Sequence, residues 1–289
     1  MTAKLIDGRA IAKRLNETTA KQSLALTSQG VIPGLAVIMV GDDPASAIYV
    51  RNKERQAGKL QFNSVVKKLP TTTTQTELLA LVARYNQDPE IHAILVQSPL
   101  PDHLDEEEVV QAINPVKDVD GLHPINLGRL FGNVGLHYPV ACTPKGIMTM
   151  LHDQKINISG QHVLMIGRSR LVGKPMVALL NNENATVTLA HRHTGADELT
   201  ALSKMADIVI VAVGQPNIVT ANMVKPGATI IDVGMNRKAD GKLTGDVADT
   251  AIEVAGYITP VPGGVGPMTI ATLMQQTVQL AAWQNGLEV

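Results

Sequence analysis

The chain has very few aromatic residues and a single cysteine. Of its 289 residues, only 2% are Phe, Trp or Tyr, although 45% are hydrophobic. A core built from aliphatic side chains is therefore expected, in a chain long enough for one large or two medium domains. Because Cys142 is the only cysteine, no intrachain disulfide can form, and a reducing cytoplasm is the simplest location.

The sequence also lacks an excess of charge and long apolar runs. Its 25 Lys and Arg residues and 26 Asp and Glu residues give a net charge of -1, which does not favour nucleic-acid binding through a basic surface. No apolar run approaches the ~20 residues of a membrane-spanning helix, and the first residues lack the apolar segment of a signal peptide. We therefore expect a cytoplasmic protein without membrane or nucleic-acid partners.

Short apolar runs alternate with longer segments of helical pattern. The apolar runs lack polar alternation, as is typical of parallel strands covered on both faces. These predicted strands are 35–40, 92–97, 162–167, 185–190, 207–214 and 229–234. The predicted helices are 8–28, 44–59, 75–87, 144–154, 173–183, 196–204 and 267–284. The alternation predicts an α/β fold.

The segment LMIGRSRLVGKPM (164–176) has the pattern of a strand-to-helix turn that binds a phosphate. Gly167 lets the backbone approach a ligand, and the helix expected to begin near Val172 offers free N–H groups. The segment is not the G-x-G-x-x-G fingerprint, because five residues separate Gly167 from Gly173. Taken alone, the motif is as consistent with a structural turn as with a phosphate site.

The next predicted strand bears on the choice of cofactor. Arg192 lies 25 residues after Gly167, near the place where an Asp or Glu binds the ribose 2′-hydroxyl of NAD. An arginine there, with Arg168 in the first loop, suits a 2′-phosphate and favours NADP. The alternative for Arg192 is a solvated loop charge. His191 and His193 have no third ligand nearby, so no metal site is predicted.

Two later strands also end in glycine, at VAVGQPN (211–217) and IIDVGMN (230–236). In a doubly wound sheet the ligand lies across the carboxyl ends of the strands. These turns are therefore expected at the nicotinamide end of a bound dinucleotide. The need to reverse the chain direction explains the glycines equally well.

Three separated segments carry polar residues suited to a small ligand. Tyr49 and Lys53 are one turn apart on a predicted helix, so a ring that stacks on a planar ligand would lie beside an amine. Gln97 lies at the carboxyl end of a buried strand, and Asp118 and Asp120 follow in a loop. The ordinary alternatives are a surface lysine on an amphipathic helix and acids that form Asx turns.

Six segments together closely resemble one enzyme family. They are YVRNK (49–53), VQSPLP (96–101), KDVDGLHPINLGRL (117–130), CTPKGI (142–147), GRSRLVGKP (167–175) and TPVPGGVGPMT (259–269). In this order they resemble the bifunctional methylenetetrahydrofolate dehydrogenase/methenyltetrahydrofolate cyclohydrolase family, the FolD type. The resemblance covers almost the whole chain.

The resemblance implies a two-lobed α/β fold. Residues 1–142 and 268–289 would form a folate-binding catalytic domain, with a C-terminal helix returning to the first lobe, and 143–267 a Rossmann-type NADP-binding domain. It also implies a homodimer that acts on tetrahydrofolate derivatives. NADP-dependent oxidation of 5,10-methylenetetrahydrofolate would give the 5,10-methenyl compound, and hydrolysis of that compound would give 10-formyltetrahydrofolate.

The resemblance further implies roles for individual residues. Lys53 matches the catalytic lysine of the family, Gln97 the glutamine that holds and tunes it, and Asp120 the acid that hydrogen-bonds the pterin. Tyr49 matches the tyrosine that stacks on the aminobenzoyl ring of the folate. The other expected folate contacts are Val50, Val96, Ser98, Pro262, Gly263, Gly264 and Val265. The expected NADP contacts are Thr143, Gly167, Arg168, Ser169, Gly173, Arg192, Val213, Gly214 and Met235.

Some features depart from the pattern of the family. Ser98 stands where members often have leucine, and ERQAGKLQF (54–62) lacks a cysteine and moves a glycine, which leaves the end of that helix open. Arg170 matches no fixed position. The alternatives are another two-lobed NADP-dependent dehydrogenase, of the shikimate dehydrogenase type, and a folate- or nucleotide-binding protein without activity. The first needs neither KDVDG nor PGGVGPMT, and the second leaves the set Lys53, Gln97 and Asp120 unexplained.

Overall fold

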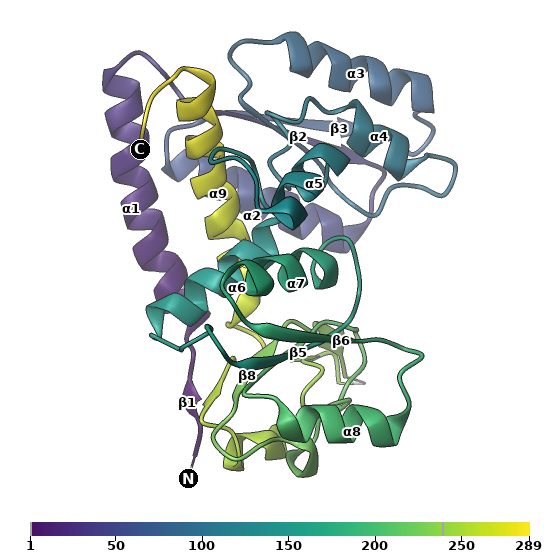
Figure 1. Cartoon of the computed structure of the whole chain (residues 1–289). Coiled ribbons are helices and arrows are strands. Elements are labelled where there is room, and N and C mark those ends of the chain that lie inside the picture. The colour runs from purple at the N-terminus through teal and green to yellow at the C-terminus, as the bar shows by residue number, and fades with distance from the viewer. Residues whose placement is uncertain (1, 239) are drawn as a thin grey trace. The chain divides into compact units, whose positions relative to one another are not determined.

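The computed structural model describes residues 2–238 and 240–289 (Figure 1). Its contacts divide the chain into two compact units, each built from separate stretches of sequence. The six-stranded unit comprises the residues up to Lys13 together with Thr143–Thr269, and the three-stranded unit comprises Arg14–Cys142 and Ile270–Val289. Within the described part of the chain, no helix is long and apolar enough to cross a membrane.

A parallel sheet forms the centre of the six-stranded unit. Its strand order is β1-β11-β8-β7-β5-β6, with all neighbours parallel. The strands are β1 (Lys4–Leu5), β5 (His162–Ile166), β6 (Thr186–Ala190), β7 (Ile208–Val211), β8 (Thr229–Asp232) and β11 (Tyr257–Ile258). Because β6 lies on one side of β5 and β7 on the other, the winding reverses at β5. Ligands of open α/β sheets bind at such a point, beyond the carboxyl ends of the strands.

Helices and short segments complete this unit. They are α6 (Cys142–Asp153), α7 (Gly173–Asn182), α8 (Ala196–Met205), the 3-10 helices η1 (Ala221–Met223) and η2 (Asp249–Glu253), and the antiparallel pair β9 (Asn236–Arg237) and β10 (Leu243–Thr244). The strands β7 and β8 are buried at every position. Their aliphatic side chains fill the core that the composition predicts.

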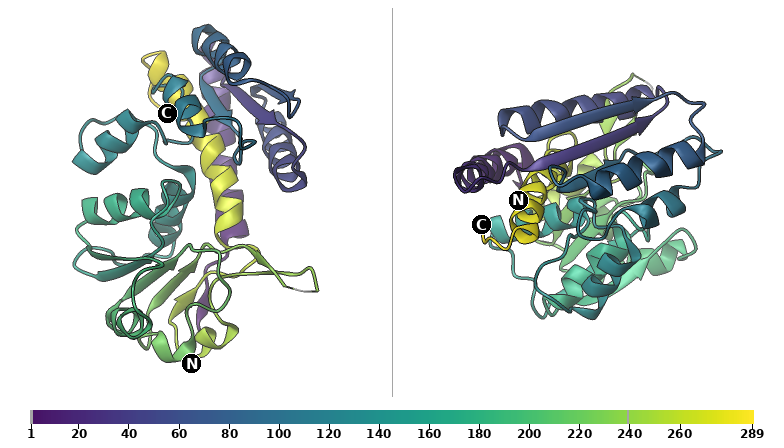
Figure 2. Two further views of the ribbon diagram at one scale, coloured as in Figure 1. Left: turned by 90° about the vertical axis from the view of Figure 1, so that its right-hand side faces the viewer. Right: turned by 90° about the horizontal axis from the view of Figure 1, so that it is seen from above.

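The three-stranded unit has a parallel sheet of order β3-β2-β4. Its strands are β2 (Gly34–Val40), β3 (Asn63–Leu69) and β4 (Ala93–Val96). Its helices are α2 (Pro44–Lys59), α3 (Gln75–Gln87), α4 (Glu106–Ala112) and α5 (Pro124–Gly132), with the later parts of α1 (Gly8–Ser28) and α9 (Val265–Gln284). In this unit α9 and α1 run side by side (Figure 2).

Burial of the central strand β2 on both faces of the sheet explains why its sequence is a continuous apolar run. All of its residues are buried, and successive side chains point to opposite faces of the sheet. Leu35, Val37 and Met39 join the core that includes Leu273 and Val278 of α9. The intervening residues Ala36, Ile38 and Val40 join the core that includes Leu78, Val82 and Tyr85 of α3. The C-terminal helix thus returns to this unit, as expected.

The six predicted strands and seven predicted helices are all present, with ends shifted by a few residues. The sequence did not predict β3, whose Lys67 and Lys68 are exposed. Charged side chains suit an edge strand but hide its apolar pattern. The helix α2 ends at Lys59, which answers the question left open by the altered segment after Lys53.

The observed units differ at their ends from the division expected at 1–142, 143–267 and 268–289. Residues up to Lys13 lie with the six-stranded unit. The cause is β1, which pairs with β11 through Lys4 opposite Tyr257, while Ala3 joins the core of that unit. A strand of two residues carries too little pattern to be found in the sequence.

Candidate functional site

The amine of Lys53 and the amide of Gln97 meet in the three-stranded unit. Lys53 lies on α2, whose first turn is capped by the Asp43 carboxylate accepting from the Ser46 N–H at 2.7 Å. Gln97 directly follows β4, and its N–H donates to the Ile38 carbonyl at 2.8 Å. Lys53 Nζ donates to Gln97 Oε1 at 2.9 Å. A helix and a strand end thus bring together residues that are 44 positions apart.

The Gln97 side chain is held in one orientation. Its Nε2 donates to the carbonyl oxygen of Ser98 at 2.7 Å, which leaves Oε1 to face Lys53. An amide presents an oxygen acceptor and nitrogen donors on the same group, so this second bond selects which of them the amine meets. Gln97 therefore accepts from Lys53 without placing a negative charge beside it.

Burial lowers the pKa of Lys53, and the negative charge of Asp120 opposes this effect. A lysine with a lowered pKa releases its proton more readily, which suits it to proton transfer. Burial also raises the pKa of Asp120, which the positive charge of Lys53 opposes and the charge of Asp118 reinforces. The structure therefore brings Lys53, Gln97 and Asp120 together.

The neighbouring acid, Asp118, bonds the loop that carries it and not the lysine. It is 2% exposed, and its Oδ2 accepts from the His123 N–H at 2.8 Å and from Asn126 Nδ2 at 2.9 Å. These bonds join the loop to the first turn of α5. Of the two acids, Asp118 thus holds the loop together, as the Asx-turn alternative suggested, and Asp120 interacts with the lysine.

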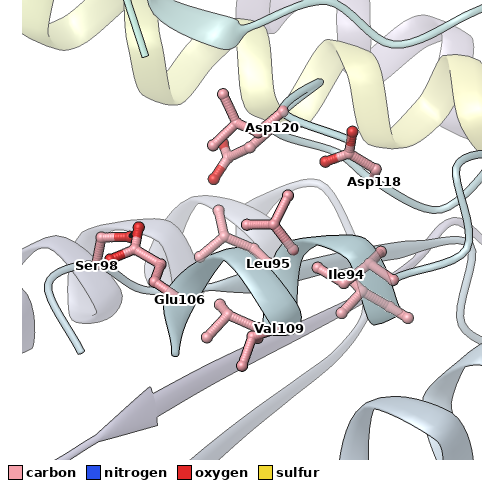
Figure 3. A pocket seen from close by; sticks show the side chains of 11 residues that line it. Ile94, Leu95, Ser98, Glu106, Val109, Asp118 and Asp120 are labelled. Carbon is pink, nitrogen blue, oxygen red and sulfur yellow. Dashed lines mark hydrogen bonds between the residues drawn. The ribbon is translucent and has the colours of Figure 1, made fainter. Parts of the chain in front are cut away.

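A small cavity lies beside these acids (Figure 3). Ser98 is at its edge, and its hydroxyl donates to Glu106 Oε1 at 2.6 Å. The remaining lining is largely aliphatic, which lowers the local polarity around the carboxylates. The lining residues are Ile94, Leu95, Val96, Ser98, Glu106, Val109, Val110, Ile113, Asp118, Asp120 and Leu122.

The other expected folate contacts have varied surroundings. Tyr49 and Val96 are half-buried, but Val50 is 1% exposed and belongs to the core, so only its backbone remains for a ligand. The segment Pro262–Val265 belongs to the six-stranded unit, where it leads into α9. There the carbonyl of Gly263 accepts from the Arg9 N–H at 3.2 Å.

The loop after β5 packs so closely that it requires its glycines. Gly167 has φ +119°, and a Cβ there would lie 2.4 Å from the Ala212 carbonyl oxygen. A Cβ on Gly173 would lie 2.0 Å from the Gly167 carbonyl oxygen. Ser169 Oγ accepts from the Val172 N–H at 3.1 Å, so its side chain shapes the entry into α7. The glycine turn thus brings β5, β7 and α7 together at the reversal point of the sheet.

The two arginines lie beyond neighbouring strand ends. In the parallel pair β5–β6, Ile166 lies opposite Ala190, and Arg168 and Arg192 each follow two residues later. Both side chains are exposed. Arg192 Nε donates to His193 Nε2 at 3.1 Å, so the histidine helps to orient this arginine. Arg170 is half-buried, in contrast to the two arginines assigned to NADP.

The remaining expected NADP contacts follow β7 and β8 or begin α6. Val213 is 37% exposed and Met235 is 53% exposed, so both present apolar surface beyond the strands. The N–H groups of Val213 and Gly214 donate to Asp246 Oδ2 at 2.8 and 3.0 Å. Thr143 Oγ1 lies 2.9 Å from Thr269 Oγ1, within the same unit.

Two family models match the chain in succession. The tetrahydrofolate dehydrogenase/cyclohydrolase catalytic domain matches residues 6–120, and the tetrahydrofolate dehydrogenase/cyclohydrolase NAD(P)-binding domain matches residues 141–285. The chain belongs to this family. Among curated relatives, the bifunctional protein FolD of Lactiplantibacillus plantarum is 58% identical over 283 residues, which is 98% of each chain.

Solved structures of the tetrahydrofolate dehydrogenase/cyclohydrolase family are also similar to the chain. The bifunctional enzyme FolD from Campylobacter jejuni is 42% identical, with a TM-score of 0.95 over 99% of this chain and 100% of that one. The FolD enzyme of Trypanosoma brucei, complexed with NADP cofactor and inhibitor, is 37% identical, with a TM-score of 0.94 over 99% of each chain. The family and the two-domain fold implied by the motifs are therefore confirmed.

Sequence reasoning missed three acids of this family member. Glu106 lines the cavity and accepts from Ser98, while Asp232 and Asp246 bond backbone N–H groups beyond β7 and β8. The sequence offered one signal for Asp232, an acid at the end of a buried apolar strand. Glu106 is one acid in a run of four, and Asp246 lies in a segment without strong periodicity.

Proposed function

We propose that the protein is a bifunctional enzyme of one-carbon metabolism. It oxidises 5,10-methylenetetrahydrofolate with NADP and hydrolyses the resulting 5,10-methenyl compound to 10-formyltetrahydrofolate. The observation that carries the proposal is the Lys53–Gln97 hydrogen bond of 2.9 Å, together with the lowered pKa of Lys53 and the nearby charge of Asp120. The matching family models and the bifunctional FolD relatives support this function rather than the shikimate dehydrogenase type or an inactive binding protein.

Hydrolysis of the methenyl compound requires a proton to move. Water adds to the methenyl carbon and loses one proton, which leaves a hydroxyl group on that carbon. A carbon–nitrogen bond of the ring then breaks as its nitrogen gains a proton, and the hydroxyl proton passes to solvent as the formyl C=O forms. Neutral Lys53 accepts the first proton at Nζ and returns one to the leaving nitrogen. Gln97 keeps the amine in place through both steps, because its oxygen accepts from the neutral and the charged form alike.

Asp120 and the residues around it are proposed to orient the folate. The carboxylate accepts from the N–H and amino groups of the pterin, and the Tyr49 ring stacks on the aminobenzoyl group. Val96 and Ser98 complete the contacts from this unit, with Val50 contributing backbone atoms. Contacts proposed for the six-stranded unit are Pro262, Gly263, Gly264 and Val265.

The six-stranded unit is proposed as the NADP-binding domain, and the three-stranded unit as the folate-binding catalytic domain. The residues beyond β5 and β6 fit NADP, because two exposed arginines follow paired strand ends and no carboxylate stands at position 192. When bound, NADP accepts the hydride that leaves the methylene carbon. Arg168 and Arg192 bind its 2′-phosphate, and Thr143, Gly167, Ser169, Gly173, Val213, Gly214 and Met235 line the rest of the site.

We further propose a homodimer that acts in the cytoplasm and supplies purine biosynthesis. Support for association comes from β6, an edge strand of the sheet whose Leu189 is 38% exposed. Exposed strand edges with apolar side chains favour pairing with another chain. Light scattering on the purified protein tests the dimer, and a mass equal to one chain would contradict it.

The proposed function is tested by mixing the purified protein with 5,10-methylenetetrahydrofolate and either NADP or NAD. We expect absorbance from the methenyl compound and NADPH to rise, and the methenyl signal then to decay as water adds. Synthetic methenyltetrahydrofolate supplied without NADP should be hydrolysed as well. Absence of turnover with both substrates would overturn the proposal.

A further inference from the structure

Two buried carboxylates tie together the turns beyond β7 and β8. Asp246 is 0% exposed, and its Oδ2 accepts from the N–H groups of Val213 and Gly214 at 2.8 and 3.0 Å. Its Oδ1 accepts from Asn236 Nδ2 at 2.8 Å. One side chain thus holds the turn after β7 and the turn after β8 at once.

Asp232 makes the second half of this arrangement. It is 4% exposed, and its Oδ1 accepts from the N–H groups of Gly234 and Asp246, each at 2.9 Å. Its Oδ2 accepts from the Val247 N–H at 3.0 Å. Asp232 therefore fixes the backbone of Asp246, whose carboxylate in turn fixes Val213 and Gly214.

The fit around both carboxylates is tight. A Cβ on Gly245 would lie 1.8 Å from Asp232 Oδ2, and a Cβ on Gly234 would lie 2.3 Å from Asp246 Cγ. The two glycines thus let the acids approach the backbone closely enough to bond it.

Stability alone is a poor explanation for this pair. Burying two like charges beside each other is costly, and the backbone bonds only partly compensate. Burial raises the pKa of Asp232 to about 6, and the negative charge of Asp246 adds to this effect. These two carboxylates shape turns at the edge of the sheet where ligands bind. Buried charges in such a place are more typical of functional positions than of purely structural ones.

We propose that Asp246, supported by Asp232, is a positioning residue for the nicotinamide end of NADP. This inference rests on the proposed NADP site, in which Val213, Gly214 and Met235 line that end of the cofactor. The carboxylates hold the turns at 213–214 and 233–236 in the shape that the cofactor requires. They act through those turns and do not touch the reacting atoms.

The test compares two ligands on the full-length protein by titration calorimetry. NADP reaches both ends of the site, whereas 2′,5′-ADP lacks the nicotinamide and reports only on the end with Arg168 and Arg192. Asp246→Asn keeps the size of the side chain but replaces one acceptor oxygen with an N–H donor. We expect it to weaken NADP roughly tenfold, as the loss of about one well-placed hydrogen bond would. Affinity for 2′,5′-ADP and the rate of methenyl hydrolysis should stay within about twofold.

Asp207→Asn is the matched control. The Asp207 carboxylate also accepts from a backbone N–H, that of His162 at 3.0 Å, and from Lys225 Nζ at 2.6 Å. It immediately precedes β7, at the amino end of the sheet and away from the proposed cofactor site. We expect this variant to lower thermal stability and leave the affinity for NADP unchanged.

Asn236→Ala provides a milder variant in case Asp246→Asn folds poorly. It removes the hydrogen bond to Asp246 Oδ1, and a smaller loss of NADP affinity in the same direction supports the inference. Unchanged NADP affinity in both variants, or an equal loss for NADP and 2′,5′-ADP, would overturn it. If the unaltered protein binds 2′,5′-ADP but not NADP, or binds neither, the proposed cofactor fails first and this inference fails with it.

Discussion

Lys53 combines a chemical role with a cost to the folded state. Its ammonium is desolvated, and the negative charge of Asp120 only partly offsets that effect. We expect Lys53→Met to slow methenyl hydrolysis by roughly 10²–10⁴-fold, the range for loss of a general acid–base group. The hydrolysis assay checks this effect, and an unchanged hydrolysis rate would refute the role of Lys53.

Gln97 provides a test based on pH. Because the pKa of Lys53 lies below its ordinary value of 10.5, hydrolysis should slow as the pH falls through that lowered pKa and the amine becomes protonated. Gln97→Glu would place a negative charge 2.9 Å from Nζ and raise the pKa of Lys53. The pH–rate profile should therefore shift to higher pH, with slower hydrolysis at neutral pH. A profile that does not move would contradict the proposed contact in the active enzyme.

Arg192 provides a test of cofactor choice. We expect Arg192→Ala to lower kcat/KM for NADP. The loss should correspond to ~1.5–3 kcal/mol, the value of a lost charge-assisted hydrogen bond. The kcat/KM for NAD should change little. Arg84→Ala on α3, where the side chain is also exposed, is the control and should affect neither cofactor. Equal losses for NADP and NAD in Arg192→Ala would exclude contact with the 2′-phosphate.

At the scale of elements, the end of β8 links stability to pH. Asp232 binds its proton more tightly in the folded protein, with a pKa of about 6 against an ordinary value of 3.8. Its contribution to the free energy of unfolding is therefore complete below pH 3.8 and is lost as the pH rises through about 6. Raising this pKa from 3.8 to about 6 corresponds to about 3 kcal/mol.

Denaturant unfolding of the unaltered protein and of Asp232→Asn, at pH 4.5 and at pH 7, checks this linkage. The stability of the unaltered protein relative to the variant should be about 2 kcal/mol lower at pH 7 than at pH 4.5. The sign follows because the variant has no group to titrate at this position. A difference that is constant across this range would show that the carboxylate is already ionised in the folded protein at low pH.

Most elements could be predicted because their patterns are local. A few consecutive residues are enough to predict β2 from its apolar run. The same holds for α3, whose start is marked by the capping residues Thr74 and Glu77. The short helices α4 and α5 were missed because the first begins in a run of acids and the second lies between turns. Seven to nine residues carry too little helical periodicity to stand out.

The site was predictable to the extent that its residues carry a motif. Lys53, Gln97 and Asp120 belong to segments that resemble the family, and the structure brings them together. Asp246 bonds the N–H groups of Val213 and Gly214, more than 30 positions earlier in the chain. Backbone N–H groups are present at nearly every residue, so no sequence pattern reveals which of them a distant acid will bond.

At the scale of the whole molecule, the compact units do not follow the order of the chain. The family models match two consecutive stretches, 6–120 and 141–285, but each compact unit also needs a distant segment. The first residues supply β1 to the six-stranded sheet, and Ile270–Val289 join the three-stranded unit. Excising either unit as one continuous stretch would therefore leave a strand without its neighbour or a core without its helix.

The return of α9 also has a consequence for the order of events during synthesis. Leu273, Met274 and Val278 are fully buried in the core that covers one face of β2. A ribosome makes these residues after all the strands and the earlier helices of that unit. Until they arrive, the core around Leu35, Val37 and Met39 lacks the side chains of α9, so part of its apolar surface is exposed to water. The unit that is synthesised first is therefore completed last, and the nascent chain passes through a period in which one face of its central strand is open to chaperones.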